Sequence, residues 1–171
     1  MRWWEESRQQ SALPFYEHMT MEKEKYGDPV IAAMHTAEHV LTGTIVRRYG
    51  CERPFTTHIE KKKTKVDFRL DAQPSREELD AIEQDVNAVL AQNLPVTEEF
   101  LPRAEAAKHY DLSRLPETAG DTVRIVRVGE SDACPCIGAH VADTSEIPPI
   151  RIVSADSADG NLRVRFKFNK S

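Results

Sequence analysis

The sequence predicts an α+β domain in which a largely antiparallel sheet packs with helices. Two segments carry apolar residues at helical spacing, and several others alternate apolar and charged residues with the period of two that half-buried strands show. Helices separated by hairpin-like strands favour the α+β class. A chain of 171 residues is long enough to bury a real core in one domain.

The first helix is predicted between Asp28 and Gly50. Asp28 can cap its N-terminus, Pro29 suits the first helical position, and Gly50 favours the end. An apolar stripe runs along it at helical spacing, consisting of Met34, Ala37, Leu41 and Ile45. His35 and His39, in the stretch MHTAEHVL, fall roughly 100° round the helix from this stripe. We therefore expect both histidines where the core meets solvent, as one wall of a cleft.

A hairpin is predicted for the following stretch, TTHIEKKKTKVDFRLD. Its second half alternates Val66, Phe68 and Leu70 with charged residues, which indicates a strand with one buried face. Three consecutive lysines would then occupy the tip of the hairpin.

A second helix is predicted in PSREELDAIEQDVNAVLAQNLPV. Ser75 and Glu78 form a capping-box pattern at its start, and Asn93 with Pro95 favours its end. The buried face would consist of Leu79, Ile82, Val86 and Leu90.

Strands dominate the rest of the predicted domain. We expect a strand near residues 96–101 and a short helix near residues 104–109. The stretches TVRIVRV, IRIVS and NLRVRFKF predict three more strands, and the last of them alternates apolar with basic residues.

Residues 1–27 predict a separate N-terminal helical arm, and residues 28–171 the main domain. The arm is polar with interspersed aromatic residues, a composition suited to contact with a second copy of the chain or with another protein. The remaining composition indicates a cytoplasmic protein that does not enter a membrane. The sequence contains no apolar run of about 20 residues and no signal-peptide pattern, and its three cysteines suit a reducing compartment. A net charge of -5 argues against a general nucleic-acid binder but allows a local basic patch.

The stretch CPCIGAH carries the second half of a candidate zinc site. Cys136 and His140 are four residues apart, as are His35 and His39. Tetrahedral zinc takes four nitrogen and sulfur donors, and two such pairs on different elements would complete that set. A turn at Gly138 could bring the thiolate and the imidazole together. Each pair alone has a simpler interpretation, as surface histidines or as a small buried cysteine.

The two motifs, HTAEH and CIGAH, resemble the HxxxH and CxGxH pair of the second additional domain of alanyl- and threonyl-tRNA synthetases. The same domain occurs in stand-alone alanyl-tRNA editing proteins of the AlaX type. The resemblance extends through EELDAIEQDVNAVLAQNLPV and TVRIVRVGESDACPCIGAHVADTSEI, and covers roughly residues 30–168. It implies that residues 28–171 form an editing-type second additional domain.

The family's activity is hydrolysis of the ester between a wrong amino acid and the 3′ end of tRNA. The resemblance implies that His35, His39, Cys136 and His140 bind zinc and act in catalysis through the bound metal and its water. The expected partner is aminoacylated tRNA, recognised at its 3′ end and acceptor stem. Alanine-type members release serine or glycine from tRNA for alanine, and this chain would do so in trans.

Further residues are expected around this site. Thr57 and Gly138 would contact the substrate, and the acceptor stem would be bound by Lys61, Lys62, Lys63 and Lys65. A solvated hairpin tip explains the lysines equally well. Glu38 is expected to support the helix or the ligands, and Cys134 is a candidate alternative thiolate.

Two questions stay open at the level of sequence. Many relatives carry Gly-Gly-Thr where this chain has Ile137, Gly138 and Ala139, so hydrolysis of another aminoacyl ester is an alternative activity. Four protein ligands close a tetrahedral zinc site, whereas catalytic zinc keeps a position open. The metal could therefore be catalytic, position the substrate, or stabilise the fold of a non-catalytic module that binds tRNA or a synthetase.

Overall fold

The α+β class is confirmed by a computed structural model that describes residues 28–115 and 120–169. The predicted arm, residues 1–27, lies outside this range. The strands form two separate antiparallel sheets, whereas the sequence suggested a single one. The first sheet has the order β1-β2-β7-β6, and its strands are β1 (Thr56–Ile59), β2 (Thr64–Phe68), β7 (Asn161–Phe168) and β6 (Ile150–Ala158). The second has the order β3-β4-β5, and its strands are β3 (Val96–Pro102), β4 (Thr122–Val128) and β5 (Asp132–Pro135).

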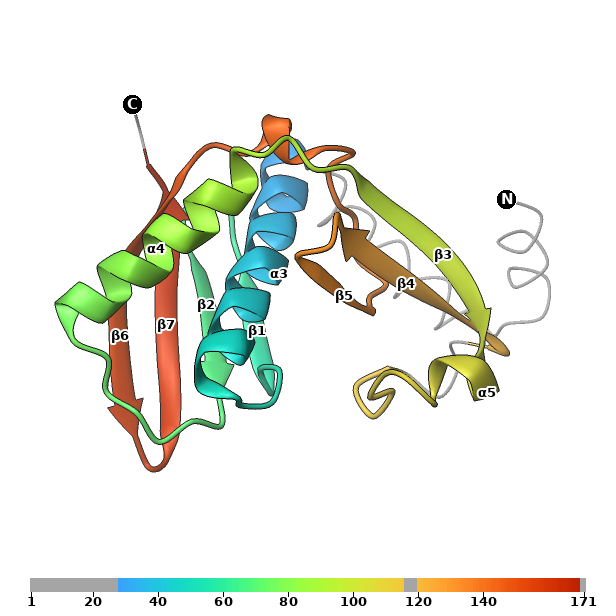
Figure 1. Cartoon of the computed structure of the whole chain (residues 1–171), viewed down its shortest axis with the longest axis horizontal. Helices are drawn as coiled ribbons and strands as arrows, with labels where there is room; N and C mark the ends of the chain where they lie inside the picture. The colour runs from blue at the N-terminus through green and yellow to red at the C-terminus, as the bar shows by residue number, and fades with distance from the viewer. Residues whose placement is uncertain (1–27, 116–119, 170–171) are drawn as a thin grey trace.

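The central element is helix α3 (Pro29–Tyr49), which lies between the two sheets (Figure 1). Its predicted caps are confirmed. Asp28 Oδ1 accepts a hydrogen bond from the backbone N–H of Val30 at 2.7 Å, and Gly50 ends the helix with a φ of 66°. The left-handed conformation at this position favours glycine.

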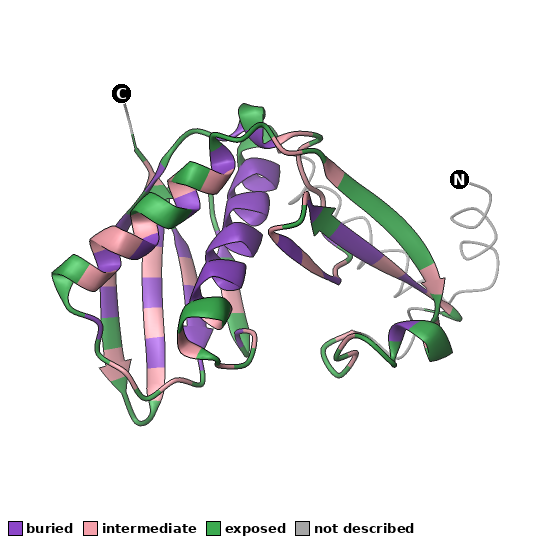
Figure 2. Cartoon of the chain, in the orientation of Figure 1, coloured by how far each residue is buried: buried purple, intermediate pink, exposed green. Residues whose placement is uncertain are grey.

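Helix α3 is buried round its whole circumference from Ile31 to Ile45 (Figure 2). The expectation that His35 and His39 lie where core meets solvent is therefore wrong. Helix α4 and the β1–β2 hairpin contact one side of α3, while β4 and β5 contact the other. Gly43 permits this close approach, because a Cβ atom there would lie 3.1 Å from the carbonyl oxygen of Ser131.

Helix α4 (Arg76–Leu90) packs beside α3 on the four-stranded sheet (Figure 1). Ser75 accepts a hydrogen bond from the backbone N–H of Glu78 at 3.1 Å, as the cap pattern predicts. The helix ends earlier than expected, at Leu90, and Asn93 follows with a φ of 55°. All four predicted apolar residues are buried, namely Leu79, Ile82, Val86 and Leu90. They join the main core with α3 and the inner face of the sheet.

The smaller sheet differs most from expectation. Strand β5 was not predicted, because its four residues contain a proline and no apolar–charged alternation. Helix α5 (Arg103–Ala106) is shorter than the predicted 104–109 and covers a small second core with Val123 and Ile125. Over residues 28–115 and 120–169, no helix is long and apolar enough to cross a membrane.

Candidate metal centre

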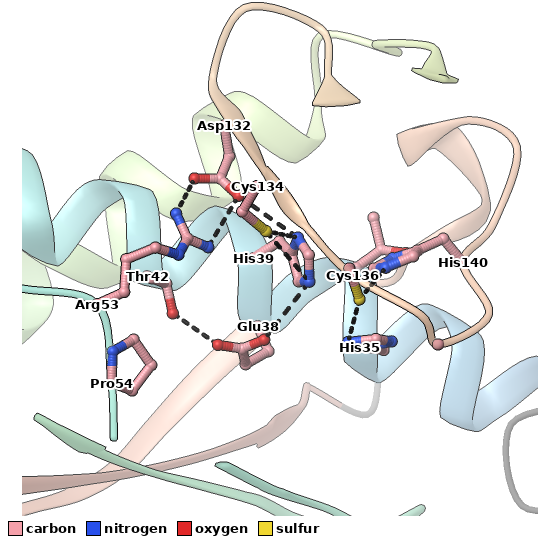
Figure 3. A network of polar contacts seen from close by, with 12 residues as sticks. His35, Glu38, His39, Thr42, Arg53, Pro54, Asp132, Cys134, Cys136 and His140 are labelled. Carbon is pink, nitrogen blue, oxygen red and sulfur yellow. Dashed lines mark hydrogen bonds and ion pairs between the residues drawn. The ribbon is translucent and has the colours of Figure 1, made fainter. Parts of the chain in front are cut away.

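The four predicted ligand side chains converge between α3 and the segment that follows β5 (Figure 3). Cys136 Sγ lies 3.4 Å from His35 Nε2 and 3.4 Å from His140 Nε2. One donor atom from each of these residues and from His39 lies within 4.8 Å of the other three. Donors bound tetrahedrally at about 2.0–2.3 Å from zinc are about 3.5 Å apart. The spacing of these donor atoms therefore suits a single ion after a small contraction.

The three imidazole rings pack against one another. His35 and His140 stack with ring centroids 4.1 Å apart, and His39 meets them edge-on at 4.9 and 4.5 Å. His35 and His39 are buried, whereas Cys136 and His140 are half-buried, so the donors form a compact group that solvent reaches in part.

Backbone and hydroxyl groups orient two of the rings. The His35 Nδ1–H donates to the carbonyl of Ala139 at 3.1 Å, so Nε2 is the ring nitrogen that carries the lone pair. The His140 Nδ1–H donates to the Thr36 hydroxyl at 2.9 Å, because that hydroxyl donates its own proton to the carbonyl of Ala32. Both Nε2 atoms consequently face Cys136.

Arg124 of β4 fixes the loop that carries the thiol. Its Nη1 donates to the carbonyls of Cys136 at 3.0 Å and of Gly138 at 2.7 Å. Its Nε donates to Glu98 of β3 at 2.6 Å, which orients the guanidinium. Sequence reasoning missed this role, since Arg124 looked like an ordinary outward residue of an alternating strand.

Gly138 lies directly against the His35 ring. A Cβ atom at this position would be 2.4 Å from His35 Cε1 and 2.7 Å from His35 Nδ1. No side chain fits unless the ring or the loop moves. This contact gives Gly138 a role in ligand placement, and its expected contact with substrate stays a prediction.

We expect Gly138→Ala to lower metal affinity about 10- to 100-fold, as changes next to metal ligands commonly do. The added methyl group must displace the His35 ring from the acceptor that fixes its orientation. Competition with a chromophoric chelator measures the affinity. Ile137→Ala is the matched control in the same loop, because the Ile137 side chain is exposed and should leave affinity unchanged. Equal affinity of the two variants would show that the close approach is unimportant.

His39 is held by a buried ionic network (Figure 3). Its Nδ1 lies 3.4 Å from Asp132 Oδ2 and 3.3 Å from Cys134 Sγ. Asp132 also accepts two hydrogen bonds from Arg53, at 2.7 and 3.1 Å. On the other side of the ring, Glu38 Oε2 lies 3.9 Å from His39 Nε2. The carboxylate of Asp132 thus orients a candidate ligand and is itself oriented by a guanidinium.

Glu38 and Cys134 both support His39 from buried positions. Glu38 accepts a hydrogen bond from Thr42 Oγ1 at 2.6 Å, which agrees with the supporting role expected for it. Cys134 forms a second close group with His39 and Asp132 and stays the candidate alternative thiolate. Asp132 and Cys134 have the same parity as Cys136 along the chain, and this period-two pattern was the signal available in the sequence.

Burial and mutual contacts shift the protonation equilibria of the cluster. Burial opposes ionisation of Cys136, but the contacts of its Sγ with His140 and then His35 outweigh burial and hold the pKa of the thiol well below its usual value. Burial would lower the pKa of His39, but the Cys134 and Asp132 charges raise that pKa well above its usual value. Burial first, then repulsion from the neighbouring histidines, lowers the pKa of His140 to about 3. A thiolate and a neutral imidazole are therefore available as ligands near neutral pH.

The remaining predicted residues lie on the β1–β2 hairpin. Thr57 is half-buried in β1 opposite Val66, and its contact with substrate stays a prediction. The predicted tRNA-binding lysines comprise three exposed tip residues and one half-buried residue of β2, namely Lys61, Lys62, Lys63 and Lys65. Lys61 Nζ lies 2.6 Å from Asp28 Oδ2, so the tip lies against the N-terminus of the helix that carries His35.

The fold and the cluster define an α+β domain with a buried three-histidine, one-cysteine group that can bind a metal ion. The family model described as the threonyl and alanyl tRNA synthetase second additional domain matches residues 123–165. The alanine–tRNA ligase of Bacillus subtilis is 31% identical over 153 residues, which cover 85% of this chain and 17% of that protein. The chain therefore belongs to the family of this second additional domain.

Archaeal relatives give the same result. The alanine–tRNA ligase of Hyperthermus butylicus is 35% identical over 140 residues, and that of Methanothrix thermoacetophila is 34% identical over 140 residues. These matches cover 78% and 79% of this chain but 15% of each relative. The chain thus spans about a sixth of the length of these three curated relatives, from 15% to 17%.

Proposed function

We propose that this chain is a zinc-dependent trans-editing hydrolase that deacylates mischarged tRNA, with Ser-tRNA(Ala) or Gly-tRNA(Ala) as its substrate. The observation that carries the proposal is the convergence of four nitrogen and sulfur donors in a domain of this family. Its partner would be aminoacylated tRNA, bound through the 3′ end and the acceptor stem in the cytoplasm.

The donor chemistry fits zinc. Three imidazoles and one thiolate suit this borderline-soft ion, and the separations of 3.4 Å between Cys136 Sγ and two Nε2 atoms match tetrahedral geometry. His35, His39, Cys136 and His140 would hold the ion. Bound zinc would supply Lewis acidity that polarises an ester carbonyl.

The protein's own contribution is to hold the donors in fixed positions. Arg124 holds the loop of Cys136, the Ala139 carbonyl and the Thr36 hydroxyl orient two imidazoles, and Asp132 orients the third. Preorganised groups of this kind need little rearrangement when substrate binds. Ile137, the residue after Cys136 in the chain, has an exposed apolar side chain.

A non-catalytic binding module is the second candidate. It is favoured by one observation, since four protein donors already close a tetrahedral site. In that case zinc would stabilise the domain while the exposed surface docks on tRNA or a synthetase.

Incubation of the protein with serine-, glycine- and threonine-charged tRNAs separates the two functions. We expect release of serine or glycine from tRNA for alanine, and loss of this activity after chelation or in His35→Ala. Threonine-charged tRNA is the specificity control, and selective cleavage of its ester would instead indicate hydrolysis of another aminoacyl ester. Charged tRNAs that persist at the blank rate while chelation unfolds the domain would support the binding module.

A further inference from the structure

One face of the four-stranded sheet collects basic side chains. Helices α3 and α4 both contact this sheet (Figure 1). The inner face of the sheet is apolar and belongs to the main core. Strand residues alternate between faces, so the residues between the buried apolar ones share the outer face. The basic residues on it form what we call the basic sheet face: Lys65, Arg151, Arg163, Arg165 and Lys167. Asp67 and Asp156 are the acidic residues on the same face of these strands.

The acidic residues neutralise only part of this charge. Arg163 pairs with Asp67 at 2.7 Å, and Arg165 pairs with Asp156 at 3.0 Å. Lys65, Arg151 and Lys167 have no ion-pair partner among the described residues. An excess of positive charge therefore lies on one face of a chain whose net charge is -5.

The strand register places like charges opposite each other twice. Arg151 of β6 is paired with Lys167 of β7, and Lys65 of β2 is paired with Arg165 of β7. Directly opposed like charges destabilise an antiparallel sheet. An anionic partner on this face would remove that cost. Since neighbouring strands are about 4.8 Å apart, the basic residues of three strands span about 10 Å.

Two residues of the basic sheet face lie at the end of the sheet that is near the candidate metal centre. Lys167 and Arg151 pair beside Thr64, the first residue of β2, so they lie at the end of the sheet where the lysine tip is. That tip contacts Asp28. Seven residues of helix, about 10 Å, separate Asp28 from His35.

We propose that the basic sheet face binds the phosphate backbone of the tRNA acceptor stem and so directs the 3′ end toward the metal centre. The inference rests on the proposed function and adds the docking surface to it. Regularly spaced phosphates match basic groups on adjacent strands, and such contacts supply affinity without reading sequence.

Binding of uncharged tRNA to Arg151→Gln/Lys167→Gln tests the proposal apart from catalysis. We expect affinity to fall at least about tenfold, and the slope of log affinity against log salt to decrease by about 2, because two phosphate contacts are lost. Thermal stability should stay equal or rise, since a like-charge pair is removed. Arg48→Gln/Lys108→Gln removes the same charge from exposed residues outside the sheet and should bind as the wild type does.

Cleavage of a minimal substrate, the serine ester of adenosine, distinguishes this inference from the proposed function. The Arg151→Gln/Lys167→Gln variant should cleave it at the wild-type rate while acting more slowly on charged tRNA. Equal tRNA affinity and salt slope in wild type and variant would overturn the docking surface. The docking surface would also be overturned if the variant bound phosphatidylserine vesicles more weakly than the wild type but bound tRNA equally well. A wild-type protein that binds tRNA through this face but cleaves neither ester would overturn only the proposed function.

Discussion

Cys136→Ala loses metal affinity by more than about 100-fold, because the variant lacks the thiolate donor. This loss is larger than the loss expected when a residue that only orients a ligand is replaced. Cys136 Sγ is 3.4 Å from Nε2 of both His35 and His140, so its removal deletes the donor atom that lies next to two of the candidate imidazole ligands. The remaining imidazoles cannot replace the charge that the thiolate contributes. Deacylation should fall to the blank rate with the affinity.

Cobalt titration measures this effect directly. The wild type should develop a thiolate-to-cobalt charge-transfer absorption, and Cys136→Ala should lack it. Cys51→Ala is the matched control, because Cys51 is a half-buried cysteine in the loop after α3 that packs against the core. Cys134→Ala should keep the absorption with a modest loss of affinity. The opposite order, with absorption lost only in Cys134→Ala, would make Cys134 the thiolate ligand.

The convergence of the four candidate metal ligands was the most predictable part of the molecule, because these residues form two short motifs with a fixed spacing. One turn of helix brings His35 beside His39, whatever the helix packs against. The α3 caps and the buried face of α4 followed for the same reason, since each depends on residues close in sequence. The prediction that the two motifs converge in space depended on the resemblance to the family as well as on the spacing within each motif.

Long-range packing explains what the sequence did not reveal. The burial of α3 depends on the second sheet, whose short strand β5 has no recognisable pattern. Arg124 and Asp132 orient candidate ligands through contacts with segments distant in the chain. The period-two spacing of Asp132, Cys134 and Cys136 does not show which distant residue each side chain contacts. The Asp132–Arg53 ion pair joins residues 79 positions apart. Sequence reasoning assigned no role to either residue.

Asp132→Ala destabilises the protein by about 2–3 kcal/mol. Removing one partner of a fully buried ion pair costs about 3–5 kcal/mol, and the cost is lower here because water reaches part of Arg53. The Asp132 side chain is 4% exposed and that of Arg53 36% exposed. Chemical denaturation of the metal-free protein measures the difference in the free energy of unfolding. Asp80→Ala, at the exposed Arg76–Asp80 pair, is the control and should change it by about 0–1 kcal/mol.

A double variant separates the stability of this pair from its action on the ligand. Arg53→Met/Asp132→Leu removes both members of the ion pair, so neither of these two charges is left without its partner, and we expect the variant to recover most of the stability that Asp132→Ala loses. His39 Nδ1 loses its carboxylate acceptor at 3.4 Å in this variant and keeps the contact with Cys134 Sγ at 3.3 Å. Metal affinity should therefore remain about 10- to 100-fold below that of the wild type. If affinity recovered together with stability, Asp132 would serve the fold alone, and the orientation of His39 would depend on Cys134 and the packing of α3.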